Sequence, residues 1–327
     1  MMAALSPKKR QRVRPKYSHN ETIAAYLFLL PSLIGFIVFY ALPAVRGLLI
    51  SFTDLNTIAI GQEVNNVGLD NYRRTLGLND TLPFLKSDFG NALKVTTQYV
   101  LWNIPIQTTL AILIAVLMDR LTKSTIVRGI ILIPWLMPNV IVAMLWLWLL
   151  DPSLGLIATI LENIGLESFL QNSEWIEFKS FGFLGNPNQA IPTIAGINIW
   201  RHVGYTALLI FAGIQTIPQS LYEAAAIDGA SETASFRHIT LPLLRPVLAF
   251  VLVTTVIGSF QIFDTIAVTT EGGPIASTKV INFLIFEYAF ERLNMGLATA
   301  VSVLLFLILI VVSLVQLRLL RADEADV

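Results

Sequence analysis

Six apolar runs, each long enough to cross a membrane as a helix, constrain this chain more than any other feature. A helix needs roughly 20 mainly apolar residues to cross a hydrocarbon core of about 30 Å. Of the 327 residues, 55% are hydrophobic and 13% are charged, and none of the runs contains Asp or Glu. The runs cover residues 24–50, 95–118, 129–150, 190–217, 243–263 and 296–317. The sequence therefore predicts an all-α, polytopic membrane protein with six transmembrane helices.

The distribution of charge between the runs predicts the orientation of these helices. An even number of spans places both termini on the same side, and Lys and Arg are enriched in cytoplasmic loops. Basic residues follow the second, fourth and sixth runs: Arg120, Lys123, Arg128, Arg237, Arg245, Arg318 and Arg321. The intervening segments 53–93, 151–189 and 264–295 carry most of the acidic residues. We therefore expect both termini in the cytoplasm and these three segments outside.

We expect a basic cytoplasmic tail over residues 1–23, a transmembrane domain over 24–318 and a short cytoplasmic tail over 319–327. The basic cluster between Lys8 and Lys16 precedes an apolar run that is too long for a signal core. We interpret the run as a retained span and the cluster as a topology signal against anionic lipid, and we expect no nucleic-acid binding. The sequence has no cysteine and three scattered histidines, so we expect no metal site.

A polar-edged segment, residues 218–242, interrupts the apolar sequence between the fourth and fifth runs. Leu221 to Asp228 is rich in alanine and favours a helix. Gly229 is suited to end that helix in the left-handed conformation, and Ser231 is suited to cap a second one. Pro242 prevents the second helix from running unbroken into the fifth span. The segment is therefore predicted to form a helical hairpin on the cytoplasmic side.

This hairpin matches a known sequence pattern. The chain matches the EAA loop of binding-protein-dependent ABC importer permeases: Glu223-Ala224-Ala225, then three residues, Gly229, nine residues, Ile239, one residue and Leu241-Pro242. Further matches follow in family order: Leu30-Pro31-Ser32, Val67 to Tyr72, Ile133-Pro134-Trp135 with Pro138, Ala212 to Gln215, and Gly272-Gly273-Pro274. Over roughly residues 24–318 the chain resembles the MalF-type carbohydrate permeases.

The resemblance implies a type I ABC importer permease fold in a bacterial or archaeal cell membrane. It implies three partners: a second homologous permease subunit, a nucleotide-binding ATPase dimer and an external solute-binding protein. The chain itself would bind no cofactor, because ATP and Mg would be bound by the ATPase. The implied activity is import by alternating access. The implied solute is a di- or oligosaccharide, or a related polyol or glycerol-phosphate compound.

The resemblance also assigns the coupling of ATP hydrolysis to the hairpin. The residues that we carry over for this role are Glu223, Ala224, Ala225, Asp228, Gly229, Ala230, Phe236, Arg237, Ile239, Leu241 and Pro242. An alternative interpretation makes Ser220 and Glu223 a capping box at the start of the first helix. That alternative leaves the positions of Gly229 and Ile239 without an explanation.

Polar residues inside the spans are candidates for a solute path. Asn198, Arg201 and Tyr205 share one helix face in the fourth span. The other candidates are Asn103 and Gln107 in the second span, and Thr254 and Gln261 in the fifth, with Asp264 just beyond it. Polar residues also bond helices together in lipid, and for Arg201 we favour this second interpretation. Trp135, Trp146 and Trp148 are interpreted as interfacial or packing aromatics.

Other functional classes are less well supported. The sequence lacks a GxxxxGK phosphate loop, an HExxH helix and a GxSxG elbow, so we expect a transport subunit and no enzyme activity. A secondary carrier or channel that works without an ATPase is the first alternative, but such carriers usually have acidic groups in the membrane. A scaffold or sensor of the same fold that transports nothing is the second.

Overall fold

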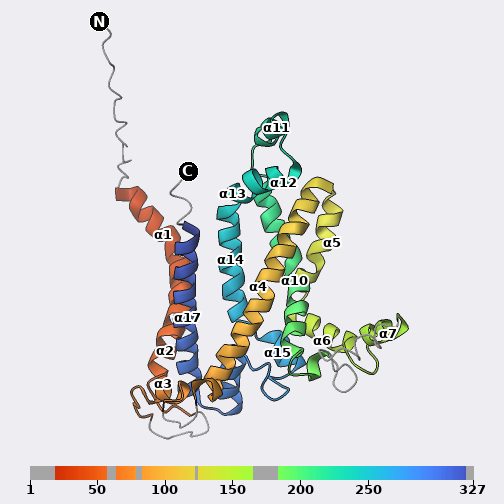
Figure 1. The fold of residues 1–327 in the computed structure, drawn as a ribbon. Helices are drawn as coiled ribbons and strands as arrows, with labels where there is room; N and C mark the ends of the chain where they lie inside the picture. The colour runs from red at the N-terminus through yellow and green to blue at the C-terminus, as the bar shows by residue number, and fades with distance from the viewer. Residues whose placement is uncertain (1–18, 57–63, 79–82, 122–123, 165–182, 322–327) are drawn as a thin grey trace. The chain divides into compact units, whose positions relative to one another are not determined.

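A computed structural model describes the chain except for residues 1–18, 57–63, 79–82, 122–123, 165–182 and 322–327 (Figure 1). The described residues are helical, with two isolated β-bridges and no strand among them. They divide into two units, Met1–Leu49 and Ile50–Val327, and each is described separately here. The basic cluster between Lys8 and Lys16 and the segment 173–182 lie outside the described residues.

The first unit is a helical rod. It comprises α1 (His19–Phe36), the π-helix η1 (Ile37–Ala41) and α2 (Leu42–Ile50), which extends one residue into the second unit. The π-helix ends two residues before Pro43. Proline has no N–H and its ring crowds the preceding turn, so a wider π turn accommodates it without breaking the helix.

The second unit is built on four long helices, α4 (Asp88–Leu121), α10 (Ala190–Ile214), α14 (Arg245–Phe260) and α17 (Met295–Arg321). Helix α4 packs against α10 and α14, and α14 packs against α17 (Figure 1). Small side chains allow the first contact to be close: Ala111, Ala115 and Ala207 are fully buried. A Cβ atom at Gly204 would lie 2.1 Å from the carbonyl oxygen of Ile131, so glycine is required where α10 crosses α5 (Thr125–Leu136).

The third apolar run forms two helices at a sharp angle. Helix α5 and α6 (Asn139–Leu149) are bent by 90° at Met137-Pro138. The bend occurs here because proline disfavours a helical conformation in the residue before it, and Met137 has a ψ of 138°. The predicted span 129–150 is therefore divided.

Four described helical segments are long and apolar enough to cross a membrane: Ile23–Ile50, Asp88–Leu121, Arg245–Thr269 and Met295–Leu319. The bent pair is a fifth if it counts as one span. Helix α10 falls outside this set and carries Asn198, Arg201 and His202. The number of six spans stays a prediction.

Short helices gather at one end of the second unit. They are α3 (Asp70–Thr75), η2 (Phe84–Lys86), α7 (Leu156–Asn163), α15 (Asp264–Thr269), α16 (Ile281–Phe286) and η4 (Glu287–Glu291). They lie within the segments 53–93, 151–189 and 264–295, which the charge distribution predicts to be outside the cell. That location stays a prediction.

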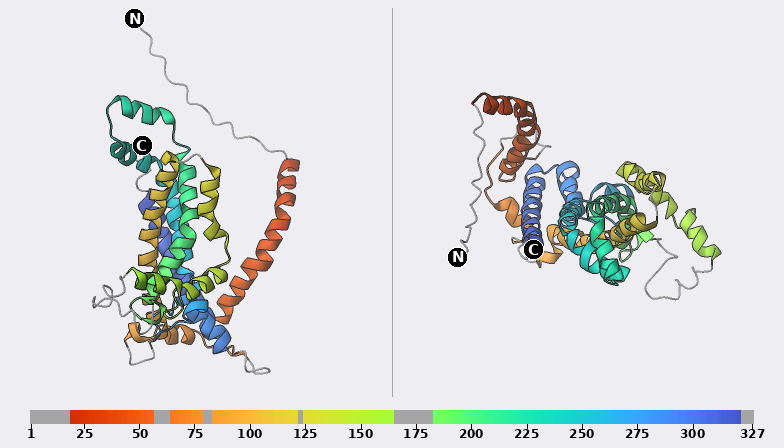
Figure 2. Two further views of the ribbon diagram at one scale, coloured as in Figure 1. Left: turned by 90° about the vertical axis from the view of Figure 1, so that its right-hand side faces the viewer. Right: turned by 90° about the horizontal axis from the view of Figure 1, so that it is seen from above.

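The hairpin projects at the opposite end of the second unit (Figures 1 and 2). It consists of α11 (Gln219–Ile227), α12 (Glu232–Ser235), the π-helix η3 (Phe236–Thr240) and α13 (Leu241–Leu243). Gly229 has a φ of 76°, as its helix-ending role predicts. The Ser231 hydroxyl accepts a hydrogen bond from the Ala234 N–H at 3.3 Å, which confirms its capping role.

The start of the hairpin differs from one expectation. Helix α11 begins at Gln219 after Pro218, and the cap residue makes no side-chain hydrogen bond. Ser220 therefore lies inside the helix, and the capping-box interpretation of Ser220 and Glu223 is wrong. Proline at the cap explains the difference, because its fixed φ sets the backbone for entry into the helix two residues before the serine. At the other end, Leu244 separates α13 from α14 just after Pro242, as expected.

Candidate functional site

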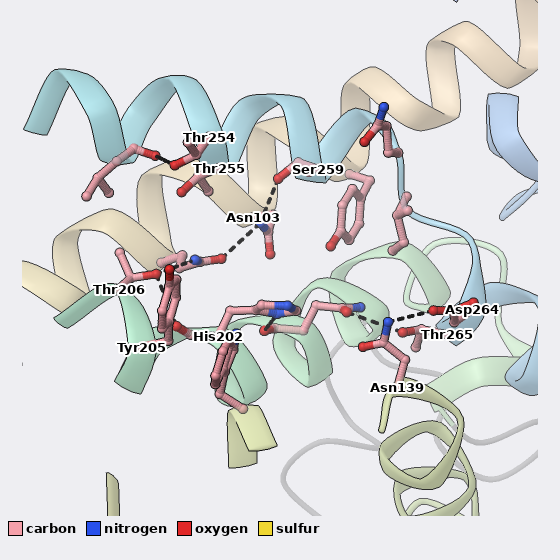
Figure 3. A pocket seen from close by; sticks show the side chains of 18 of the residues that line it. Asn103, Asn139, His202, Tyr205, Thr206, Thr254, Thr255, Ser259, Asp264 and Thr265 are labelled. Atoms are coloured by element: carbon pink, nitrogen blue, oxygen red, sulfur yellow. Dashed lines mark hydrogen bonds between the residues drawn. The ribbon is translucent and has the colours of Figure 1, made fainter. Parts of the chain in front are cut away.

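A cavity of about 350 Å³ lies between α4, α10 and α14 and reaches the beginning of α15 (Figure 3). Most of the side chains that line it are amides, hydroxyls and aromatic rings. They are Tyr99, Asn103, Gln107, Trp135, Asn139, Asn198, His202, Tyr205, Thr206, Thr254, Thr255, Ser259, Gln261, Phe263, Asp264 and Thr265, with Leu209, Val251, Gly258 and Ile262. A polar cavity inside an otherwise apolar bundle is the strongest candidate for a ligand site.

The structure brings most of the sequence-derived path candidates together here. Seven of the eight line the cavity: Asn103, Gln107, Asn198, Tyr205, Thr254, Gln261 and Asp264. They come from α4, α10, α14 with its C-cap residue Gln261, and α15, which are separated by up to about half of the chain. Arg201 is the eighth and does not line the cavity.

Buried amides join the three long helices at one end of the cavity. The Asn103 Nδ2 atom donates to the Ser259 hydroxyl at 3.0 Å and to Gln107 Oε1 at 3.1 Å. Gln107 in turn donates to the Thr206 hydroxyl at 2.9 Å. The Asn103 Oδ1 atom is buried and has no hydrogen-bond partner within the described residues. A buried acceptor without a partner is costly, so this oxygen is suited to receive a hydrogen bond from a ligand hydroxyl.

A second polar group joins α6, α10 and α15 at the other end. Asn139 donates to Asp264 Oδ2 at 2.5 Å, and Thr265 donates to Asn198 Oδ1 at 3.2 Å (Figure 3). These bonds connect the helix that follows the 90° bend to the wall of the cavity. A displacement of α6 would therefore change the shape of this end of the cavity.

An aromatic pair forms part of the wall. The rings of Trp135 and Tyr205 stack with their centroids 4.4 Å apart and their planes 8° from parallel. Sequence analysis interpreted Trp135 as an interfacial or packing residue. The structure places it beside the cavity because it lies two residues before the bend. A flat apolar surface next to hydrogen-bonding groups suits a solute with both C–H and O–H faces.

Arg201 bonds to the backbone at the bend. Its Nε and Nη2 atoms donate to the Met137 carbonyl at 3.2 and 3.0 Å, and Nη2 also lies 3.3 Å from the Trp135 carbonyl. The bend leaves these carbonyls without helical N–H partners, and the guanidinium supplies donors for them. Arg201 thus bonds α10 to the backbone at the bend between α5 and α6. This agrees with interhelical bonding, the interpretation that we favour from the sequence.

Sequence reasoning missed several lining residues. His202 and Thr206 continue the face of Asn198 at i+4 and i+8, so an extended search for helical spacing would have found them. Trp135 and Asn139 carry no comparable signal, because they lie on either side of the bend and reach the cavity from a different element.

The residues that the resemblance assigns to coupling lie in three parts of the hairpin. Glu223, Ala224 and Ala225 lie in α11, Asp228 to Ala230 form the turn, and Phe236, Arg237, Ile239, Leu241 and Pro242 lie in η3 and α13. None of the residues of α11 is buried, and Ile227 is 87% exposed. The whole of α11 is therefore accessible for contact with another protein.

Polar contacts hold the hairpin together and connect it to the bundle. The Tyr222 and Thr240 hydroxyls lie 2.9 Å apart and join its two arms. At the end of α4, Arg120 pairs with Glu232, and Asp119 accepts a hydrogen bond from Gln215 at 2.6 Å. The Arg120 pair connects the hairpin to α4, and the Gln215 bond joins α4 to the end of α10, the helix that precedes the hairpin.

Comparison with known proteins gives consistent matches over almost the whole chain. The family model for the binding-protein-dependent transport system inner membrane component matches residues 107–322. The trehalose/maltose transport system permease protein MalF of Thermococcus litoralis is 34% identical over 307 residues, which cover 94% of this chain and 96% of the relative. The sn-glycerol-3-phosphate transport system permease protein UgpA of Agrobacterium fabrum is 31% identical over 298 residues, which cover 90% of this chain and 94% of the relative.

A solved structure has the same fold. One chain of a bacterial ABC transporter involved in the import of the acidic polysaccharide alginate aligns with a TM-score of 0.74. The alignment covers 93% of this chain and 96% of the other, at 23% sequence identity. At this identity the likeness concerns the fold.

Proposed function

The chain belongs to the family of binding-protein-dependent transport system inner membrane components, and we propose that it imports a sugar by alternating access, driven by a separate ATPase. The family is that of sugar ABC importer permeases, and its members are transport subunits. The solute is a di- or oligosaccharide, or a related polyol or glycerol-phosphate compound. The named solutes of the two relatives, trehalose or maltose and sn-glycerol 3-phosphate, support this range.

The observation that carries the proposal is the polar cavity among the long helices. Its amides and hydroxyls can exchange hydrogen bonds with a polyhydroxylated solute, and the stacked Trp135 and Tyr205 rings provide an apolar face. The unpartnered Asn103 Oδ1 atom supplies an acceptor that the protein leaves free. We assign the solute path to this cavity.

The proposed topology has six spans and cytoplasmic termini. Helix α10 is the fourth span, and its polar face turns toward the cavity and the bend, so its lower hydropathy is compatible with a membrane location. The bent pair of α5 and α6 is the third span. The hairpin then faces the cytoplasm in a bacterial or archaeal cell membrane, where a soluble ATPase can reach it.

In the proposed mechanism the hairpin transmits movement of the ATPase to the cavity. ATP and Mg are bound by the partner ATPase, and this chain contributes positioned side chains only. Displacement of the hairpin moves the end of α4 through the Arg120 pair with Glu232 and the end of α10 through the chain itself, while the Gln215 bond to Asp119 holds these two helix ends together. Closure can favour one orientation of the cavity only if the hairpin contacts differ in free energy between the two states.

The experiment that tests the proposal is purification of the chain with its neighbours. We expect a second permease chain, a nucleotide-binding ATPase dimer and an external solute-binding protein, and solute-dependent ATP hydrolysis across a panel of sugars. A purified assembly without an ATPase that still transports would favour a secondary carrier or channel. An assembly that hydrolyses ATP but moves no solute into vesicles would favour a scaffold or sensor.

A further inference from the structure

The electrostatic character of the cavity distinguishes between the solute classes that the proposed function leaves open. Among the described residues that line it, Asp264 is the one carboxylate and His202 the one histidine, and no lysine or arginine lines it. The remaining groups are amides, hydroxyls, aromatic rings and aliphatic side chains. The net charge that a solute meets in the cavity therefore depends on three side chains. These are His202, the neighbouring Arg201 and Asp264.

His202 is held in its neutral form by the bonds at both ring nitrogens. Its Nε2 atom lies 2.7 Å from Arg201 Nη1, and its Nδ1 atom lies 2.9 Å from the Asn198 carbonyl oxygen. A guanidinium is a donor only, so Nε2 must accept. Nδ1 then carries the hydrogen that is donated to the carbonyl. His202 thus contributes no positive charge to the cavity wall.

The charge of Arg201 is directed to the bend. Three of its nitrogen atoms bond to the Met137 and Trp135 carbonyls and to His202. A phosphate or carboxylate group is recognised by donors that it can reach in a forked geometry. Because four of its five N–H donors are engaged in these bonds and Arg201 does not line the cavity, an anionic solute would find no free guanidinium fork there.

Asp264 supplies a negative charge at the end of the cavity. One carboxylate oxygen accepts the bond from Asn139 at 2.5 Å, and the side chain is half-buried beside Thr265 (Figure 3). A carboxylate is acceptor-only and binds hydroxyl groups well. The same charge repels a phosphate or a carboxylate in a partly desolvated site.

We infer that this subunit selects a neutral polyhydroxylated solute, a sugar or a polyol, and disfavours phosphorylated and uronic acid solutes, with Asp264 as the residue that sets the charge preference. The inference rests on the proposed function and narrows its solute class.

The test uses pairs of solutes that differ by one phosphate. The complete complex, reconstituted in nanodiscs, is equilibrated with labelled trehalose or trehalose 6-phosphate, and with glycerol or sn-glycerol 3-phosphate. We expect each phosphorylated member to bind at least about tenfold more weakly than its neutral partner, since tenfold corresponds to about 1.4 kcal/mol. Asp264→Asn keeps the shape and the bond from Asn139, and should remove most of this difference.

Two further variants make the test independent of the folding of Asp264→Asn. Glu291→Gln removes an exposed carboxylate outside the cavity and should leave the preference unchanged. Thr255→Lys places a cation on the half-buried wall and should strengthen binding of the phosphorylated members. Size-exclusion chromatography and co-purification of the partners report whether each variant assembles.

Three results would overturn the inference. Phosphorylated members that bind the wild-type complex as tightly as neutral ones, with ATPase coupling intact, would contradict the inference and leave the permease function standing. An unchanged preference in assembled Asp264→Asn would remove the role of Asp264. Failure of all four solutes to bind would contradict both this inference and the assigned solute path. A different measurement would contradict the proposed function, namely the absence of ATP-dependent uptake of any solute.

Discussion

At the level of single residues, two buried amides of α4 differ in how completely they are hydrogen-bonded. Both ends of the Gln107 amide have partners, but the oxygen of Asn103 has none among the described residues. The Asn103 Nδ2 atom donates to Ser259 on α14 and Gln107 Nε2 donates to Thr206 on α10, while Gln107 Oε1 accepts from Asn103 within α4. The Asn103 Oδ1 atom is buried without a partner in the described chain. The same side chain therefore holds α4 against α14 and offers an acceptor to the cavity. A substitution at Asn103 would affect both packing and binding.

Arg201 permits a cleaner separation of the two roles. Arg201→Met should lower stability by about 1 to 3 kcal/mol, because the carbonyls of Met137 and Trp135 lose their donors in a water-poor environment. Thermal unfolding of the detergent-solubilised complex measures this loss. Arg318→Met, at the exposed end of α17, is the matched control and should cause a much smaller change. A normal thermal midpoint for Arg201→Met together with weakened solute binding would instead place Arg201 in the solute path.

At the scale of elements, each end of the second unit is held by its own polar contacts. The hairpin is held by the Tyr222 contact with Thr240 and by a glycine in the left-handed region. The short helices at the other end are joined by charges: Glu287 pairs with Lys279 at 2.6 Å and with Arg292 at 2.5 Å. Arg292 also reaches Asp88 at the start of α4, at 3.3 Å.

Gly229→Asp should leave the subunit inserted and assembled but abolish solute-stimulated ATP hydrolysis. Aspartate tolerates the φ of 76° at Gly229 better than most side chains do, so the main change is a new charge at the tip of the proposed contact surface. Gly229→Asn is the informative comparison, since asparagine tolerates this conformation and carries no charge, and it should lose far less coupling. Normal stimulation of ATP hydrolysis by solute in Gly229→Asp would refute the assignment of the hairpin.

The ion-pair cluster predicts a pH dependence of stability. Burial raises the pKa of Glu287, but bonds from Lys279 and Arg292 outweigh it, so the net pKa is lowered from 4.5. A lowered pKa means that the stabilisation is complete above the unfolded value and is lost as the pH falls through the folded value. The thermal midpoint should therefore fall from about pH 5 downward, and Glu287→Gln should be less stable at neutral pH with a flatter acid limb. Parallel acid limbs for the two proteins would contradict this prediction.

At the scale of the whole molecule, the proposed function depends on which side of the membrane each end of the second unit faces. The hairpin and the short helices lie at opposite ends of the bundle (Figures 1 and 2). Only a cytoplasmic hairpin can contact an ATPase, and the short helices would then face the solute-binding protein. The orientation is thus a requirement of the mechanism.

The natural absence of cysteine makes this orientation directly measurable. Leu154→Cys lies in an exposed turn at the end of the short helices, and Ala226→Cys lies on the exposed surface of α11. In intact spheroplasts, a membrane-impermeant maleimide should label Leu154→Cys at once and Ala226→Cys only after the membrane is permeabilised. The reverse pattern would invert the topology and exclude the proposed coupling.

The sequence by itself determined the features that depend on local chemistry. The apolar runs predicted an all-helical membrane protein, and Gly229, Ser231 and Pro242 predicted the turn, the cap and the break of the hairpin, because backbone preferences and capping act within a few residues. Helical spacing also indicated several cavity residues on α4, α10 and the fifth span. The capping-box alternative failed since Pro218, just upstream, starts the helix earlier.

The tertiary structure alone decided where those faces meet. Asn103 and Ser259 are 156 residues apart and share a hydrogen bond, and no spacing along one helix can show such a contact. The 90° bend brings Trp135 and Asn139 to the cavity and exposes the carbonyls that draw Arg201 away from it. A local pattern specifies which side of a helix is polar, but the partner of that side depends on how distant helices pack.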